Sequence, residues 1–170
     1  MEQLKVGIIA CTTLVALTMT AFAATALADP TADIKALGDR FVAAFKAKDV
    51  DAIMKVYGPD QTLVVFDVVP PRQYIGAAAY CKNWQALLDS FDGPITVERS
   101  DLDVVADRNL AYSDCIDHVV GTDKHGEKVD LTLRVTDVYK KARGGWRVIH
   151  EHVSVPVDLA TNKPDLASKP

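Results

Sequence analysis

The spacing of hydrophobic residues changes from helical to strand-like near the middle of the chain. In the first half, apolar residues recur every three or four positions, which predicts amphipathic helices. One β-branched segment interrupts them and ends at the Pro70-Pro71 pair, which is typical of a strand. The predicted helices span residues 31–48, 50–57 and 76–91, and the predicted strand spans residues 62–69.

After Gly93-Pro94, long segments alternate apolar and polar residues and are joined by short turns rich in Gly, Asn and Asp. Consecutive strands with such short connections form an antiparallel meander. These strands are predicted at residues 95–106, 109–122, 127–141 and 146–155. Helices followed by a sheet predict an α+β fold, and the polar, proline-bearing residues after Val155 predict a loose tail.

Residues 1–28 have the pattern of a secretory signal peptide. Lys5 precedes an uncharged run from Val6 to Ala24, and Ala26-Leu27-Ala28 is typical of a cleavage site. The run is also just long enough for an uncleaved membrane anchor, but its many small residues favour removal. We therefore expect a periplasmic or secreted protein that has no membrane contact after cleavage.

Composition narrows the classes of function. The chain has 170 residues, of which 49% are hydrophobic and 25% charged, and its net charge is −4. These values are those of an ordinary globular domain and give no basic surface for nucleic acid. The sequence has no glycine-rich phosphate loop, nucleophile elbow or Cys-x-x-Cys motif, so no cofactor is predicted.

Asp67 is the first candidate for chemistry, because it lies between Phe66 and Val68 in a strongly apolar strand. A carboxylate removed from water in this way has a raised pKa and can act as a general base. The alternative is a carboxylate satisfied by backbone donors or by an arginine at the end of the strand. The sequence alone leaves both interpretations open.

His150 and His152 are a second candidate, because they share one face of the last predicted strand. This spacing suits two ligands of one metal ion. No motif supplies a third ligand, so two hydrogen-bonded histidines at the surface of the sheet are the favoured interpretation.

The strand at residues 127–141 has one apolar and one polar face. Leu131, Leu133 and Val135 alternate with polar residues that include Arg134 and Thr136. The apolar face can point toward the core or be buried between subunits, and the alternation does not decide between these arrangements.

Two stretches of sequence carry a family resemblance. They are the strand that ends in Asp67 and the meander that closes on the Trp146-x-x-x-His150-x-His152-x-Ser154 pattern. Together they resemble the SnoaL-like domains of the nuclear transport factor 2-like superfamily over about residues 31–157. The resemblance implies a cone, with three N-terminal helices packed on a curved antiparallel sheet and a pocket in its mouth.

The same resemblance implies a homodimer that forms through the convex side of the sheet, which would bury the apolar face of residues 127–141. The expected domain is residues 29–157, preceded by the signal peptide and followed by a flexible tail at residues 158–170. The closing pattern is also similar to the association domain of calcium/calmodulin-dependent protein kinase. A non-catalytic oligomeric hub is therefore an alternative.

Steroid isomerases share this fold and can be compared residue by residue. The position of their catalytic base falls on Asp67, and the position of their oxyanion-binding tyrosine falls on Phe41, which has no donor. Their protonated aspartate falls on Thr136. The resemblance therefore implies that this chain keeps the base but lacks the groups that stabilise the oxyanion, so it is not expected to be a competent ketosteroid isomerase.

The resemblance implies that the protein binds a small, largely apolar molecule in the cone. The alternative is a weak isomerase- or dehydratase-type enzyme with Asp67 as its base. The implied ligand-binding residues are Tyr57, Trp84, Tyr112, Asp114, His118, Arg134, Thr136 and Glu151. Cys81 and Cys115 are expected on opposite sides of the sheet, too far apart for a disulfide.

Overall fold

The computed structural model describes residues 29–168, so the predicted signal peptide lies outside the described residues. Its helices are α1 (Pro30–Lys46), α2 (Val50–Met54) and α3 (Ala77–Asp89). Asp29 caps α1 by accepting a hydrogen bond from the Thr31 amide at 3.0 Å, and Asp49 caps α2 in the same way. None of the described helices is both long and apolar enough to cross a membrane.

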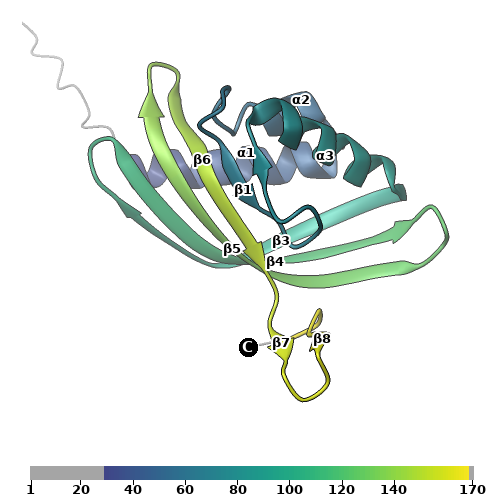
Figure 1. The fold of residues 1–170 in the computed structure, drawn as a ribbon. Helices are drawn as coiled ribbons and strands as arrows, with labels where there is room; N and C mark the ends of the chain where they lie inside the picture. Colours follow the sequence, from purple (N-terminus) through teal and green to yellow (C-terminus); the bar gives the residue numbers. More distant parts are fainter. Residues whose placement is uncertain (1–28, 169–170) are drawn as a thin grey trace, which may run out of the picture.

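The strands form one curved six-stranded sheet with the order β2-β1-β6-β5-β4-β3, and the three helices cover its concave face (Figure 1). Its strands are β1 (Val64–Phe66), β2 (Tyr74–Ile75), β3 (Phe91–Ala106), β4 (Leu110–Asp123), β5 (Lys128–Ala142) and β6 (Gly145–Ser154). The α+β architecture and the meander from β3 to β6 are as predicted.

Two details differ from the predicted cone. The sheet is mixed, because β1 pairs with β6 in parallel and Val64 lies opposite His150. In addition, α3 follows β1 and β2 in the chain, so only α1 and α2 precede the sheet. The β1–β6 pair joins segments that are far apart in sequence, and local alternation carries no signal for such a pair.

The core lies between the helices and the concave face of the sheet. Its centre is an aromatic cluster in which the Trp84 ring meets Phe41 and Tyr80 edge to face, with both centroid distances at 5.6 Å. Phe41 comes from α1, whereas Tyr80 and Trp84 come from α3. Edge-to-face pairs of this kind add to the free energy gained by burying the rings, and here they fix α1 against α3.

The apolar face of β5 points toward the helices. Leu131, Leu133 and Val135 line a cavity under α1 and α3, whereas Arg134 and Thr136 are exposed on the convex face. The expectation that this apolar face is buried at a subunit contact is therefore wrong. These residues therefore give no support for a homodimer. The homodimer stays a prediction from the family resemblance alone.

Cys81 on α3 is partly exposed and Cys115 on β4 is buried, and both are free thiols. Cys115 shares the concave face with its cross-strand partner Val135. The expectation that the two cysteines lie on opposite sides of the sheet is therefore wrong, because β4 presents Cys115 to the side that α3 covers.

The C-terminal residues differ from the loose tail that was predicted. They form a small hairpin of β7 (Val157–Asp158) and β8 (Lys163–Pro164), which projects away from the sheet on the side opposite the helices (Figure 1). The Leu166 carbonyl accepts a hydrogen bond from the Thr132 amide at 2.7 Å. This bond holds the end of the hairpin to β5 just beyond the point where β5 and β6 stop pairing.

Candidate functional site

A cavity of about 140 Å³ lies between α1, α3 and the concave face of the sheet. Most of its wall is apolar and comes from the aromatic cluster, from β3 and from the inward face of β5. The polar residues on the wall are Asp67, Tyr80, Asn83, Arg99, Asp117 and Glu151. An apolar enclosure with a few converging polar groups is the usual form of a small-molecule site.

Asp67 follows β1 directly and lines the cavity. One carboxylate oxygen accepts a hydrogen bond from the Val68 amide at 2.7 Å, and the other accepts one from Asn83 Nδ2 at 3.0 Å. Burial raises the pKa of Asp67, and the hydrogen bonds oppose this only in part. The carboxyl group is thus partly desolvated, as its apolar sequence context predicted.

Arg99 on β3 and Asp117 on β4 form a buried ion pair on the cavity wall. The guanidinium donates from Nε to Oδ1 at 2.8 Å and from Nη2 to Oδ2 at 2.7 Å. Their side chains are 13% and 7% exposed, so the pair is shielded from screening by water. Helix α1 comes close to this pair at Gly38, where a Cβ would lie only 3.1 Å from Arg99 Nη1.

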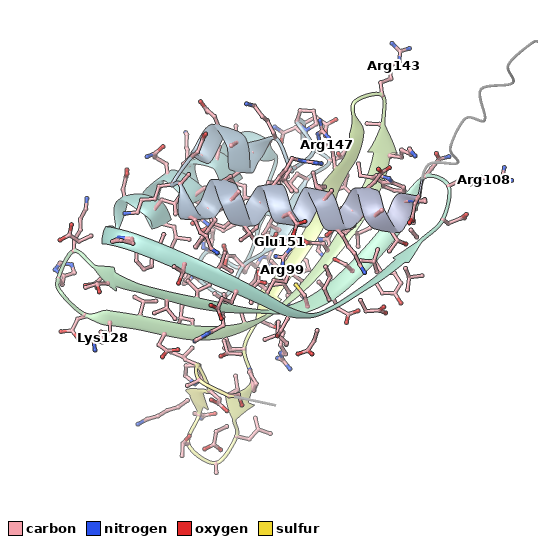
Figure 2. The ribbon with its side chains drawn as sticks, turned by 180° about the vertical axis from the view of Figure 1, so that it is seen from behind. Arg99, Arg108, Lys128, Arg143, Arg147 and Glu151 are labelled. Carbon is pink, nitrogen blue, oxygen red and sulfur yellow. The ribbon has the colours of Figure 1, made fainter. Side chains whose placement is uncertain are left out.

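Glu151 on β6 is a buried acid that receives two tyrosine hydroxyl groups. Tyr57 donates to Oε2 at 2.8 Å and Tyr80 donates to Oε1 at 2.5 Å. Burial, together with the charge of Asp137, raises the pKa of Glu151 well above its ordinary value. Figure 2 shows Glu151 and Arg99 beneath α1, on the side of the sheet that the helices cover.

Asp137 on β5 lies directly opposite Glu151 and is also buried. It accepts a hydrogen bond from the Tyr139 hydroxyl at 3.1 Å, and the Tyr139 and Ser113 hydroxyls are 2.9 Å apart. Asp137 Oδ1 has no hydrogen-bond partner among the described residues. Burial raises the pKa of Asp137 to about 6. Next to the cavity, the sheet therefore holds two buried acids, Asp137 and Glu151, whose pKa values are both raised.

Four of the residues proposed from the sequence belong to this region. Asp67, Trp84 and Glu151 line the cavity, and Tyr57 lies behind Glu151 as its hydrogen-bond donor. Phe41 also lines the cavity, as the comparison with steroid isomerases implied.

The remaining predicted residues are on the convex face of the sheet, so their assignment to the pocket is wrong. They are Tyr112, Asp114, His118, Arg134 and Thr136. Adjacent strand residues point to opposite faces, and the predicted register placed these side chains one residue out of phase. The inward positions beside them are Ser113, Cys115, Asp117, Leu133, Val135 and Asp137.

His150 and His152 are held at the surface of the sheet. The His150 ring nitrogen Nδ1 lies 2.9 Å from the Val64 carbonyl, and both imidazole rings meet the Phe66 ring edge to face. Within residues 29–168 there is no cluster of three or more side chains that could hold a metal ion. These contacts match the favoured interpretation of two packed, hydrogen-bonded histidines.

Several polar residues of the site were not predicted from the sequence: Tyr80, Asn83, Arg99, Asp117 and Asp137. A usable signal was present on β5, where the alternation that places Val135 inward also places Asp137 and Tyr139 inward. An inward polar residue on an apolar strand face marks a buried acid that needs partners. Arg99 carries the same signal, because it continues the inward alternation of Ile95 and Val97 on β3. Asn83 has a weaker one, since it lies three residues after Tyr80 and four before Leu87 on α3.

Known structures resemble this chain over most of its length. An NTF2-like protein of unknown function from Pseudomonas putida KT2440 is 30% identical, with a TM-score of 0.73 over 82% of this chain and 95% of that chain. A "putative dehydratase from the NTF2-like family" of Streptomyces avermitilis is 15% identical, with a TM-score of 0.63 over 74% and 97% of the two chains.

A third similar structure, from Xanthomonas campestris, is described as a "putative calcium/calmodulin dependent protein kinase II association domain". It is 24% identical, with a TM-score of 0.62 over 72% of this chain and 84% of that chain. No curated protein matches the sequence. The SnoaL-like domain matches residues 34–158, which is most of the described chain. The chain therefore belongs to the SnoaL-like family and has the NTF2-like fold.

Proposed function

We propose that the protein is exported and binds a small, largely apolar molecule in the cavity between its helices and the concave face of its sheet. The observation that carries this proposal is the largely apolar cavity of about 140 Å³ beneath α1 and α3. An apolar protein cavity of roughly 150 Å³ holds one benzene ring. The expected ligand is therefore about the size of a single six-membered ring.

The surroundings of the cavity support binding rather than a packing defect. A cavity in a well-packed core costs stability in proportion to its volume. Here the aromatic cluster and the buried Arg99–Asp117 ion pair form part of the cavity wall and fix the elements that surround it. Asp67 and Glu151 add polar groups beside the apolar surface. Export rests on the pattern of residues 1–28 alone.

The proposal is tested by filling the cavity. Val135→Phe places an aromatic ring into the space, whereas Thr136→Phe adds the same ring to the convex face one residue later. Native mass spectrometry of the purified proteins should show a small bound molecule in wild type and Thr136→Phe but not in Val135→Phe. If all three proteins carry the same adduct, the ligand lies elsewhere and the proposal fails.

A second candidate function is weak proton-transfer catalysis with Asp67 as the base. Its support is the raised pKa of a carboxyl group on the wall of the cavity. Asp67→Asn keeps the shape of the side chain and its hydrogen bond from the Val68 amide, so the fold should stay intact. Because it removes the basic carboxylate, it should abolish turnover of any substrate found by screening. Turnover that persists in Asp67→Asn would move the chemistry to another group.

A non-catalytic hub is the third candidate, because one of the similar structures is described as an association domain. In a hub the cavity would be incidental, and filling it with Val135→Phe would leave assembly unchanged. Light scattering that shows a large assembly in both proteins, together with no bound molecule in native mass spectrometry of the wild type, would favour the hub over the binding protein.

A further inference from the structure

We propose that the ligand of this cavity carries a positive charge, as a small apolar amine does, and that Asp67 is the residue that pairs with it. The proposal rests on the proposed binding function and names its ligand class. The observation behind it is an imbalance of charge on the cavity wall, where acids outnumber bases and the base is already paired.

The wall of the cavity includes the carboxyl groups of Asp67, Asp117 and Glu151. Among the described residues that line it, Arg99 is the one cation. The guanidinium group of Arg99 is already paired with the Asp117 carboxylate through the two hydrogen bonds at 2.8 and 2.7 Å. An anionic ligand would therefore meet no free positive charge, and recruiting Arg99 would leave Asp117 buried and unpaired.

Asp67 is the acid without a counter-charge. Its hydrogen-bond donors are the Val68 amide and the Asn83 side chain, both neutral, and the ion pairs within residues 29–168 do not include it. Asn83 is held in the donating orientation, since its Oδ1 accepts a hydrogen bond from Tyr74 at 2.8 Å. A partly buried carboxylate in this position gains most from a cation brought by a ligand.

The neighbouring acid does not compete for that cation. Both Glu151 oxygens accept tyrosine hydroxyl groups, and burial keeps this acid toward its neutral form. The titratable groups that face Asp67 are Tyr74 from β2, Tyr80 from α3 and Glu151 from β6, and the negative charge of Asp67 contributes to a raised pKa in all three. The field in this part of the cavity is therefore negative.

The apolar wall suits the rest of such a ligand. Tyr80 and Trp84 stand edge to face on the same side of the cavity as Asn83, and all three come from α3. Aromatic rings stabilise a nearby ammonium group through their quadrupoles and bury the hydrocarbon part of the molecule. The combination of an unpaired carboxylate with an aromatic wall selects an organic cation over a metal ion or a carboxylic acid.

The experiment compares three ligands that share one ring and differ in charge: benzylamine, benzyl alcohol and benzoate. Binding is measured by calorimetry at pH 7 for wild type, Asp67→Asn and Asp114→Asn, the last an exposed acid on the convex face. We expect benzylamine to bind at least tenfold more tightly than benzyl alcohol, and benzoate to bind most weakly. Asp67→Asn should bind benzylamine and benzyl alcohol within about threefold of each other, whereas Asp114→Asn should retain the tenfold preference for benzylamine.

A second measurement needs no variant. Lowering the pH until Asp67 is protonated should weaken benzylamine binding in the wild type and leave benzyl alcohol binding unchanged. Equal binding of benzylamine and benzyl alcohol, or tighter binding of benzoate, overturns the charge assignment and leaves the binding function standing. Failure of all three ligands to bind contradicts the binding function itself, and this proposal with it.

Discussion

Asp137 on β5 and Glu151 on β6 lie directly opposite one another in the sheet, and both side chains are buried beneath α1, at 5% and 6% exposure. Burial disfavours the ionised form of both acids, and the charge of Asp137 further raises the pKa of Glu151. The pKa of Asp137 is raised to about 6 and that of Glu151 is raised as well. The folded protein thus holds protons that the unfolded chain releases.

This relationship predicts how stability depends on pH. A raised pKa in the folded state stabilises the protein at low pH, and the stability is lost as the pH rises through the folded value. Because of Asp137 alone, the free energy of unfolding should fall by about 1 to 2 kcal/mol when the pH is raised from 5 to 8. Urea unfolding at several pH values should show this loss in the wild type and a flatter profile in Asp137→Asn.

The control for this measurement is Asp114→Asn, which removes an exposed acid from the opposite face of the sheet. Its pH profile should match that of the wild type. A profile in Asp137→Asn as steep as that of the wild type would mean that Asp137 does not hold its proton in the folded state.

The buried pair of Arg99 and Asp117 predicts a large and asymmetric effect of mutation. Arg99→Met leaves the Asp117 carboxylate buried without a partner, which should cost about 3 to 5 kcal/mol in urea unfolding. Replacing both residues, with Arg99→Met and Asp117→Leu together, should recover much of that loss because no charge is left buried. Additive losses in the double variant would show that the pair is not coupled.

The two cysteines should differ sharply in reactivity. Burial raises the pKa of the Cys115 thiol to about 12, so it carries almost no thiolate at neutral pH. Alkylation of the native protein followed by peptide mass mapping should label Cys81, which is partly exposed, and leave Cys115 unlabelled until denaturant is added. Peptides that show a Cys81–Cys115 disulfide would contradict the arrangement of α3 against β4.

The sequence predicted the elements well and the faces of the strands poorly. Helix and strand boundaries fell within a few residues of α1, α3 and the four long strands, because hydrophobic periodicity is a local property. Which face of β5 points inward depends on the register of the strand, and a slip of one residue moves every side chain to the opposite face of the sheet. The match to steroid isomerases placed the protonated acid on Thr136, whereas the buried acid is Asp137, the next residue.

That correction changes the reason for expecting no steroid isomerase activity. A buried acid, Asp137, is present one residue from the expected position, but the nearby Tyr57 and Tyr80 hydroxyl groups already donate to Glu151. Size is a further obstacle, because a four-ring ketosteroid needs a pocket of roughly 300 Å³ or more and the cavity volume is about 140 Å³. An assay with a 5-ene-3-ketosteroid should show no rate above background, and robust isomerisation would require the cavity to open.

Fluorescence of Trp84 gives the most direct test of ligand binding in the cavity, since Trp84 lines it and Trp146 does not. These are the chain's two tryptophans, so Trp146→Phe leaves Trp84 as the reporter. Titration of this variant with benzylamine or benzyl alcohol should give a saturable change in emission, and adding Val135→Phe should remove it. A flat titration in Trp146→Phe, or an equal response from Trp146 in a Trp84→Phe variant, would contradict binding in the cavity.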